Sequence, residues 1–282
     1  DAAPDRVDLR DLPYRAPLVC LPDRWPGLET IQKYLPAYEA DGMILDQMSE
    51  GACTGFGLAA VINYLYWSRW QLGGADPAEK PKPVSPRMLY HMAQIYDEWA
   101  GEDYEGSSCR GAMKGWHKHG VCVEELWPYK DKQFVPPQKG WELDAAEHPL
   151  GAYYRIDKGS IVDMQAAIRE VGAIYCSASV HRGWQRVATS KDKLPVIEPS
   201  TQPIGGHAFA LVGYKREGFI VQNSWGPDWG FHGFAVLRYD DWLANGFDAW
   251  AVVTGAPIER PGASPDTTAR QPLQATVRER RL

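Results

Sequence analysis

The chain has 282 residues, of which 44% are hydrophobic and 23% charged, a composition that is typical of a folded globular protein and excludes disorder throughout. Its 30 basic and 36 acidic residues leave a net charge of -6, so we expect no nucleic-acid partner and no attraction to an anionic membrane. The most apolar run, 57–67, is shorter than the roughly 18 residues that a membrane span requires. The sequence does not open with a signal-peptide pattern, and secretion and a cytoplasmic location both stay open.

The first part of the chain predicts an irregular segment followed by helices. Prolines at positions 4, 13, 17, 22, 26 and 36 interrupt residues 1–45, so we expect an extended segment that wraps the core. Residues 52–70 are almost continuously apolar and predict a helix buried on most sides, with Ser49 placed to cap it. Capping residues, prolines and glycines delimit the other predicted helices, which cover 86–96, 109–118 and 160–171.

The second part of the chain predicts antiparallel strands. Short β-branched or aromatic stretches separated by turn residues occur at 173–180, 207–214, 218–222, 233–238 and 248–253. Helices followed by strands indicate an α+β protein with two lobes. We divide the chain into an N-terminal extended segment (1–45), a helical lobe (46–150), a β lobe (151–255) and a tail (256–282) whose prolines and arginines predict a linker.

A cysteine stands at the start of the most buried predicted helix. A thiol at this place experiences the partial positive charge and unpaired amides of the helix N-terminus, which favour its thiolate form. Cys53 is therefore a candidate nucleophile, although most free cysteines are simply small buried residues.

A histidine and an asparagine follow on later strands. His207 enters an apolar strand behind Gly205 and Gly206, and Asn223 lies between strands beside Trp225. A histidine satisfied within the core and an ordinary turn asparagine are the alternatives for each residue taken alone. Together with Cys53 they form a complete set for nucleophilic catalysis, in which Cys53 is the nucleophile, His207 is its base and Asn223 orients the base.

These residues resemble the papain-like cysteine peptidases in order, spacing and local sequence. The resemblance runs from about Val7 to Val253 and implies a two-lobed papain-like α+β fold with an active-site cleft between the lobes. Its most specific part is Asn223-Ser224-Trp225-Gly226 followed by Trp229-Gly230. Further matching segments are Gln47 to Cys53, Val7-Asp8-Leu9-Arg10, Gly120-Val121, and Glu124 to Tyr129.

The resemblance implies a thiol protease, a hydrolase that works through an acyl-enzyme thioester and needs no cofactor. Cys53 would attack the scissile carbonyl of a polypeptide substrate, and His207 would pair with it and later protonate the leaving amine. Asn223 would hold the imidazole, and Trp225 would screen that contact from water. The Gln47 side chain and the Cys53 amide would form the oxyanion hole.

The sequence also departs from the family pattern. Glu50 stands where members usually carry a disulfide cysteine, and Thr54 follows the nucleophile where they usually have Trp. We therefore expect free thiols at Cys20, Cys109, Cys122 and Cys176, as in a bacterial or intracellular variant.

Substrate-binding residues are carried over from the family pattern. Ser107 to Ala112 occupies the place of the strand that binds the substrate backbone, with Ala112 where a glycine usually stands. This correspondence places substrate at Gly111, Ala112, Met113, Ser177, Gly206 and Trp225. His117 and His119 are two residues apart and do not share a helix face, so we expect no metal site. Trp116, Trp184 and Trp242 are interpreted as core residues.

Other functions remain open at this stage. A peptidoglycan-type amidase, an acyltransferase and a binding module with a blocked cleft all fit a Cys-His pair. Two segments are candidate regulators of the cleft: the Pro-rich surplus at Tyr14 to Asp41, and the basic tail from Ala256 to Leu282.

Overall fold

The computed structural model describes residues 2–99 and 105–255, so the predicted tail at 256–282 lies outside the described residues. The first half contains β1 (Ala2–Ala3), α1 (Leu28–Ala40), α2 (Cys53–Leu72), a 3-10 turn (Pro77–Glu79), α3 (Pro86–Ile95), β2 (Ser107–Ser108), α4 (Cys109–His119) and α5 (Trp141–Glu147). The second half contains β3 (Leu150–Arg155), α6 (Ile161–Val171), β4 (Ile174–His181), α7 (Arg182–Gln185), β5 (Pro203–Tyr214), β6 (Gly218–Gln222), β7 (Phe234–Arg238), α8 (Tyr239–Asn245) and β8 (Gly246–Thr254).

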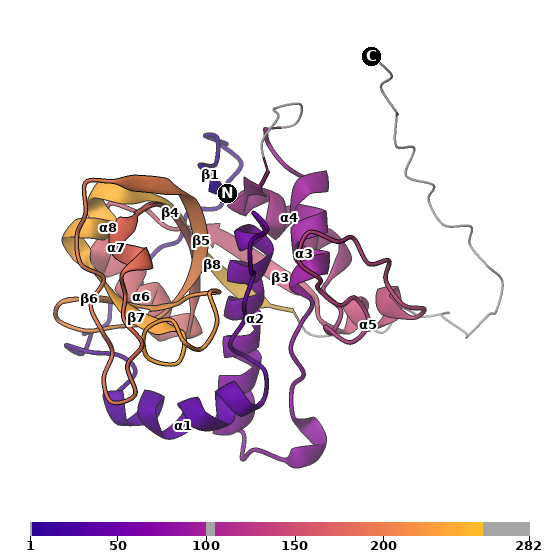
Figure 1. The fold of residues 1–282 in the computed structure, drawn as a ribbon, viewed down its shortest axis with the longest axis horizontal. Coiled ribbons are helices and arrows are strands. Elements are labelled where there is room, and N and C mark those ends of the chain that lie inside the picture. The colour runs from indigo at the N-terminus through magenta and orange to yellow at the C-terminus, as the bar shows by residue number, and fades with distance from the viewer. Residues whose placement is uncertain (1, 100–104, 256–282) are drawn as a thin grey trace.

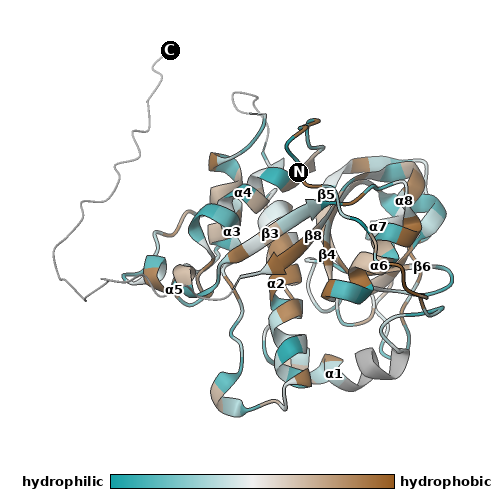
Figure 2. Ribbon diagram, turned by 180° about the vertical axis from the view of Figure 1, so that it is seen from behind, coloured by the Kyte–Doolittle hydropathy of each residue, from teal (hydrophilic) through white to brown (hydrophobic). Residues whose placement is uncertain are grey.

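The elements form a helical lobe and a β lobe, as the sequence predicts. Figure 1 shows α2, α3 and α4 gathered on one side and the sheet with α6, α7 and α8 on the other. The sheet has the strand order β3-β8-β4-β5-β6-β7, and all its neighbouring strands pair antiparallel. The core continues from one lobe into the other, because residues of α2 cluster with residues of β5 and β8. Figure 2 shows the hydrophobic colouring of α2 and β8 in this region.

Two glycines of α2 fix the position of the helix that begins at Cys53. A Cβ on Gly55 would lie 2.5 Å from the backbone nitrogen of Tyr90 on α3. A Cβ on Gly57 would lie 2.8 Å from the carbonyl of Ala208 on β5. Only glycine allows these approaches, so α2 lies tightly between α3 and β5. The first residue of α2 is thereby brought opposite the strand that carries His207.

The predicted helix boundaries agree with the structure within about two residues, but one predicted cap is wrong. Ser85 and Ser160 cap α3 and α6, since their hydroxyls accept from the amides of Met88 and Asp163. The N-cap of α2 is Ala52, which makes no side-chain capping bond. The Ser49 hydroxyl instead donates to Asp131 at 2.7 Å.

The prediction of an irregular segment over residues 1–45 is wrong for 28–40, which form α1. Leu35 and Tyr38 are buried, and the Tyr38 ring packs edge-on against Trp67 of α2 at 5.2 Å between centroids. This packing stabilises a helix that contains Pro36, because burial of an apolar face contributes more than intrinsic propensity. Figure 1 shows α1 below the lobes, where it crosses the C-terminal part of α2.

The described residues also settle two general features of the chain. None of their helices is both long and apolar enough to cross a membrane. Cys20, Cys53, Cys109, Cys122 and Cys176 are all free thiols, and only Cys20 is exposed.

Candidate active site

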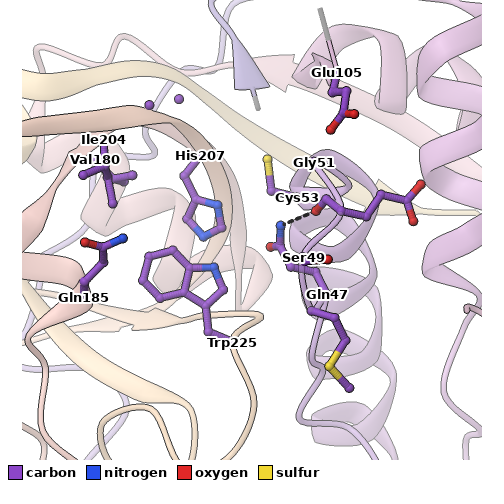
Figure 3. Close-up of a pocket in the computed structure, with 14 residues that line it drawn as sticks. Gln47, Ser49, Gly51, Cys53, Glu105, Val180, Gln185, Ile204, His207 and Trp225 are labelled. Atoms are coloured by element: carbon purple, nitrogen blue, oxygen red, sulfur yellow. Dashed lines mark hydrogen bonds between the residues drawn. The ribbon is translucent and has the colours of Figure 1, made fainter. Parts of the chain in front are cut away.

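A cleft of about 380 Å³ opens between the lobes at the start of α2 (Figure 3). The helical lobe provides the wall that carries Cys53, and the β lobe provides the wall that carries His207. The cleft therefore brings together two of the residues that the sequence assigns to the chemistry. Its lining residues are Gln47, Met48, Ser49, Glu50, Gly51, Cys53, Glu105, Val180, Gln185, Ile204, Gly205, Gly206, His207 and Trp225.

Cys53 is the first residue of α2, and its side chain is only 1% exposed. The backbone N–H groups in the first turn of a helix have no partner within the helix and carry partial positive charge. No acidic residue in this first turn of α2 offsets that charge. The Cys53 amide is therefore available to bind a developing negative charge beside the thiol.

His207 lies on β5 and is bonded to Asn223. The distance between His207 Nε2 and Asn223 Oδ1 is 2.8 Å, and the amide of Ser224 donates to the same oxygen at 2.8 Å. Because Oδ1 accepts from Ser224, the asparagine is oriented with its oxygen toward the imidazole. His207 Nε2 is then the protonated donor, and Nδ1 carries the free lone pair.

Aromatic side chains enclose this imidazole. The Trp225 ring lies 5.0 Å from the His207 ring between centroids, and Trp184 packs edge-on against it at 6.0 Å. Burial lowers the pKa of His207 to about 4, although the hydrogen bond to Asn223 acts in the opposite direction. His207 is therefore neutral at physiological pH and able to accept a proton.

Gln47 is held from both lobes. Its Oε1 accepts from the Ser224 hydroxyl at 2.8 Å, and its Nε2 donates to the Glu50 carbonyl at 3.1 Å. Its backbone N–H also donates to the Ser224 carbonyl at 2.9 Å. Only one of the two Nε2 hydrogens is used by these bonds, which leaves the other for a ligand in the cleft.

The N-terminal strand lies against one end of the cleft. Ala2–Ala3 pairs in parallel with Ser107–Ser108, and Ala2 is buried. A Cβ on Gly206 would lie 1.9 Å from the Ala2 carbonyl oxygen, so the segment presses directly on a cleft-lining glycine. Figure 3 shows β1 entering the region of the site beside the pocket. The N-terminal strand is therefore in direct contact with the cleft wall at Gly206.

Asp5 anchors this segment in the protein. Its backbone N–H donates to Asp248 Oδ2 at 2.8 Å, and its carboxylate accepts from the Arg110 amide at 2.9 Å and from Trp250 Nε1 at 2.8 Å. Burial, together with the nearby charge of Asp248, raises the pKa of Asp5 to about 7. Arg155 pairs with Asp248 on the other side.

Four of the predicted substrate-binding residues do not line the cleft. Gly206 and Trp225 do, but Gly111, Ala112, Met113 and Ser177 do not. Because α4 begins at Cys109, residues 111–113 lie in its first turns and face the interior of the helical lobe. Ala112 and Met113 are completely buried, and Gly111 is in close contact with the Ala93 carbonyl of α3.

The same burial explains Ser177, the fourth of these residues. It is completely buried on β4, and its hydroxyl contacts Asp248 Oδ2 at 3.3 Å.

The structure also adds a residue that the sequence did not point to. Gln185 lines the cleft, and no local pattern marks it, because the fold alone brings α7 to the cleft. Trp184, Trp116 and Trp242 lie in the core, as predicted, and the Trp184 ring packs against His207. In the described part of the chain, no group of three or more His, Cys, Asp or Glu residues is arranged to hold a metal.

A family model of papain family cysteine proteases matches residues 91–247, which is more than half of the chain. The chain belongs to the papain family of cysteine proteases. The matched region includes His207 and Asn223 and begins after Cys53.

Two relatives match a larger share of the chain than the family model does. The uncharacterized peptidase C1-like protein L477 of Acanthamoeba polyphaga mimivirus is 27% identical over 219 residues, which cover 72% of this chain and 68% of that protein. The cathepsin B-like CP2 of Giardia intestinalis is 26% identical over 216 residues, which cover 69% of this chain and 64% of that protein. The matches thus span about two thirds of these relatives.

Solved structures share the fold. Xylellain, a cysteine protease from Xylella fastidiosa, superposes with a TM-score of 0.68 at 23% identity, covering 92% of this chain and 96% of that chain. The proCathepsin B S9 of Trypanosoma congolense gives a TM-score of 0.64 at 17% identity, covering 90% and 86%. The papain-like α+β fold predicted from the sequence is confirmed.

Proposed function

We propose that this papain-family enzyme is a cysteine endopeptidase that uses Cys53, His207 and Asn223 as its triad. The observation that carries the proposal is the 2.8 Å bond between His207 Nε2 and Asn223 Oδ1, on the cleft wall opposite the thiol at the start of α2. It leaves the free lone pair of Nδ1 to receive the thiol proton. Free thiols throughout, with Glu50 in place of the framework cysteine, support a disulfide-free, bacterial-type member of the family.

The acylation step follows from this arrangement. Cys53 Sγ attacks the carbonyl carbon of the scissile bond while its proton passes to His207 Nδ1. The carbonyl oxygen becomes an oxyanion, which the Cys53 amide and the second Nε2 hydrogen of Gln47 stabilise. The tetrahedral intermediate then collapses. The C–N bond breaks, the amine leaves with the proton from His207, and the acyl group remains on Cys53 as a thioester.

Deacylation uses the same groups with water as the nucleophile. His207 Nδ1 removes a proton from a water molecule that attacks the thioester carbonyl. The oxyanion forms again beside Gln47, the C–S bond breaks, and the proton returns to the Cys53 sulfur. Asn223 keeps the imidazole in one tautomer throughout, and the ring of Trp225 shields their bond from water.

The test is chemical labelling combined with peptide cleavage on one sample. Brief treatment with iodoacetamide or a peptidyl epoxide should place the adduct on Cys53 and abolish cleavage of a peptide library in proportion to labelling. The Cys53→Ala variant should show neither the adduct at position 53 nor cleavage of the peptide library. A folded Cys53→Ala protein that still cleaves peptides would overturn the proposal.

A binding module is the second candidate, and one observation favours it. The Ala2–Ala3 strand contacts Gly206 on the cleft wall, where it would restrict a polypeptide that runs past this residue. If it never moves, Cys53 reacts with small reagents while peptides remain intact. An acyltransferase or amidase would be distinguished by transfer of the acyl group to an added amine or by cleavage of non-peptide amides.

A further inference from the structure

Glu50 forms a buried ion pair where the family usually carries a disulfide cysteine. Its carboxylate accepts two bonds from Arg87 on α3, from Nη1 at 2.9 Å and from Nη2 at 2.5 Å. The two side chains are only 16% and 5% exposed. The Lys132 amide donates to the same carboxylate at 3.2 Å. A two-pronged contact of this kind fixes the orientation of both side chains.

Arg87 also contacts Tyr129 and Lys130, a segment that is bonded to the loop 47–51. Its Nη2 donates to the Lys130 carbonyl at 3.0 Å, and its guanidinium lies 4.7 Å from the centre of the Tyr129 ring. The Tyr129 hydroxyl in turn donates to the Gln47 carbonyl at 2.7 Å. Arg87 is therefore connected to Gln47 by two routes, one through Glu50 and one through Tyr129.

The position of Glu50 determines where the Gln47 side chain points. Gln47 Nε2 donates one hydrogen to the Glu50 carbonyl, and the direction of its second hydrogen depends on that bond. Ser224 holds only the oxygen end of the same amide. An oxyanion donor that is displaced by a fraction of an ångström loses much of its effect on the transition state.

We propose that the Glu50–Arg87 pair positions Gln47 and thus holds the oxyanion hole in shape, as a noncovalent substitute for the loop disulfide. Both are positioning residues, because they act through Gln47 and the loop main chain. This inference rests on the oxyanion role of Gln47 given under the proposed function. It adds that Arg87, 40 residues along the chain from Gln47, determines catalytic rate.

The experiment compares Arg87→Met with Arg87→Lys and with a matched control. The control is Lys82→Met, which removes an exposed ion pair with Glu125 in the same lobe. Three quantities are measured on each protein: kcat and KM on a fluorogenic peptide, the rate of Cys53 alkylation by iodoacetamide, and the thermal midpoint. Alkylation is a displacement that forms no oxyanion, so it reports the thiol without the oxyanion hole.

Arg87→Met should lower kcat by about 10- to 100-fold, with KM and the alkylation rate changed by less than about threefold. Arg87→Lys should recover part of kcat, because lysine retains the positive charge but cannot form both hydrogen bonds to the Glu50 carboxylate at once. Lys82→Met should behave as the unaltered protein. Equal loss of kcat and alkylation would instead mean that the pair supports the helix of Cys53, and an unchanged kcat would overturn the proposal.

Two further variants keep the test decisive. Glu50→Met with Arg87→Met removes both charges, so it leaves no unpaired buried ion and allows folding if Arg87→Met alone does not. It should show the same separation of kcat from alkylation. Gln47→Ala tests the oxyanion role of Gln47 separately from the positioning role of the Glu50–Arg87 pair. A Gln47→Ala variant with normal kcat would rule out the oxyanion role. A slow Gln47→Ala variant beside an Arg87→Met variant of normal kcat would rule out only the positioning role.

Discussion

Gln47 and Ser224 are joined twice across the cleft. The backbone N–H of Gln47 donates to the Ser224 carbonyl at 2.9 Å, and the Ser224 hydroxyl donates to Oε1 of the Gln47 side chain at 2.8 Å. Ser224 follows Asn223, and its own amide donates to the asparagine oxygen that orients His207. Ser224 thus connects Gln47, the proposed oxyanion donor in the helical lobe, with Asn223, which orients His207 in the β lobe. The positions of the two halves of the proposed site therefore depend on each other.

Gln47→Ala should separate turnover from thiol reactivity. The missing amide acts on the oxyanion of the tetrahedral intermediate, so kcat should fall by about 100-fold or more while Cys53 alkylation stays nearly constant. Steady-state kinetics and iodoacetamide labelling on the same preparation measure the two effects. A parallel loss of both would assign Gln47 to structural support.

Ser224→Ala should have a smaller effect of the same kind. It frees Oε1 of Gln47 but leaves the backbone bond between the two residues, so kcat should fall about fivefold to tenfold, as expected for one hydrogen bond. Ser68→Ala is the matched control, because that hydroxyl bonds to Leu65 within α2. If both serine variants lose activity equally, the Ser224 hydroxyl has no specific role in the site.

The acid limit of the reaction should lie well below the usual histidine range. Burial lowers the pKa of His207 to about 4, so the neutral imidazole needed to accept the thiol proton persists down to about that pH. The pH dependence of Cys53 alkylation should therefore have its acid midpoint near 4. Asn223→Asp should raise this midpoint, because a carboxylate would then stabilise the protonated ring. A midpoint above 6 in the unaltered protein would contradict the described environment of His207.

Releasing the N-terminal segment should raise peptide hydrolysis. Asp5→Ala removes the carboxylate that accepts from the Arg110 amide and from Trp250, so Ala2–Ala3 should leave Gly206 more often. We expect a severalfold increase in kcat/KM on peptides. Asp8→Ala is the control, because Asp8 pairs with exposed Arg10 in the same segment. Equal activity of the unaltered protein and Asp5→Ala would show that the segment does not limit access.

The same segment should be held more tightly at low pH. Asp5 in place has its pKa raised to about 7, whereas a released Asp5 has the ordinary value of 3.8. The held state is thus progressively disfavoured as the pH rises from 3.8 to about 7, above which Asp5 is ionised in both states, in the held state beside Asp248 and with Arg110 and Arg155 nearby. The activity ratio of Asp5→Ala to unaltered protein should therefore shrink from pH 5.5 to pH 8. A ratio that grows over this interval would reverse the expected sign.

The predicted regulator at Tyr14 to Asp41 is corrected by the structure. None of these residues is among those that line the described cleft, and α1 packs on the C-terminal part of α2. Its deletion is therefore expected to destabilise the helical lobe without opening the cleft. The other predicted regulator, the tail, lies outside the described residues.

The sequence identified residues whose chemistry depends on local position. Cys53 at a helix start, His207 on a strand and Asn223 before an aromatic residue each occupy a place that periodicity and turn signals define. The structure brings Cys53 and His207 to one cleft and adds the bond between His207 and Asn223.

The remaining features depend on contacts between distant parts of the chain. Glu50 and Arg87 are ordinary charged residues in the sequence, and only the packing of α3 beside the loop that precedes α2 brings them together. Ala2–Ala3 carries no signal that it would pair with Ser107–Ser108. Of the predicted substrate-binding residues, Gly111, Ala112 and Met113 do not line the described cleft because α4 turns them inward, which a family pattern cannot reveal.

The most direct test of the central claim is detection of the acyl-enzyme. The protein is mixed with an activated peptide ester, quenched in acid within seconds, and examined by intact mass and peptide mapping. The proposed mechanism predicts one acyl group per chain, attached to Cys53 as a thioester that hydroxylamine removes, and absent in Cys53→Ser. Turnover of the ester with no acyl group on Cys53, or with the acyl group on another residue, would contradict the account.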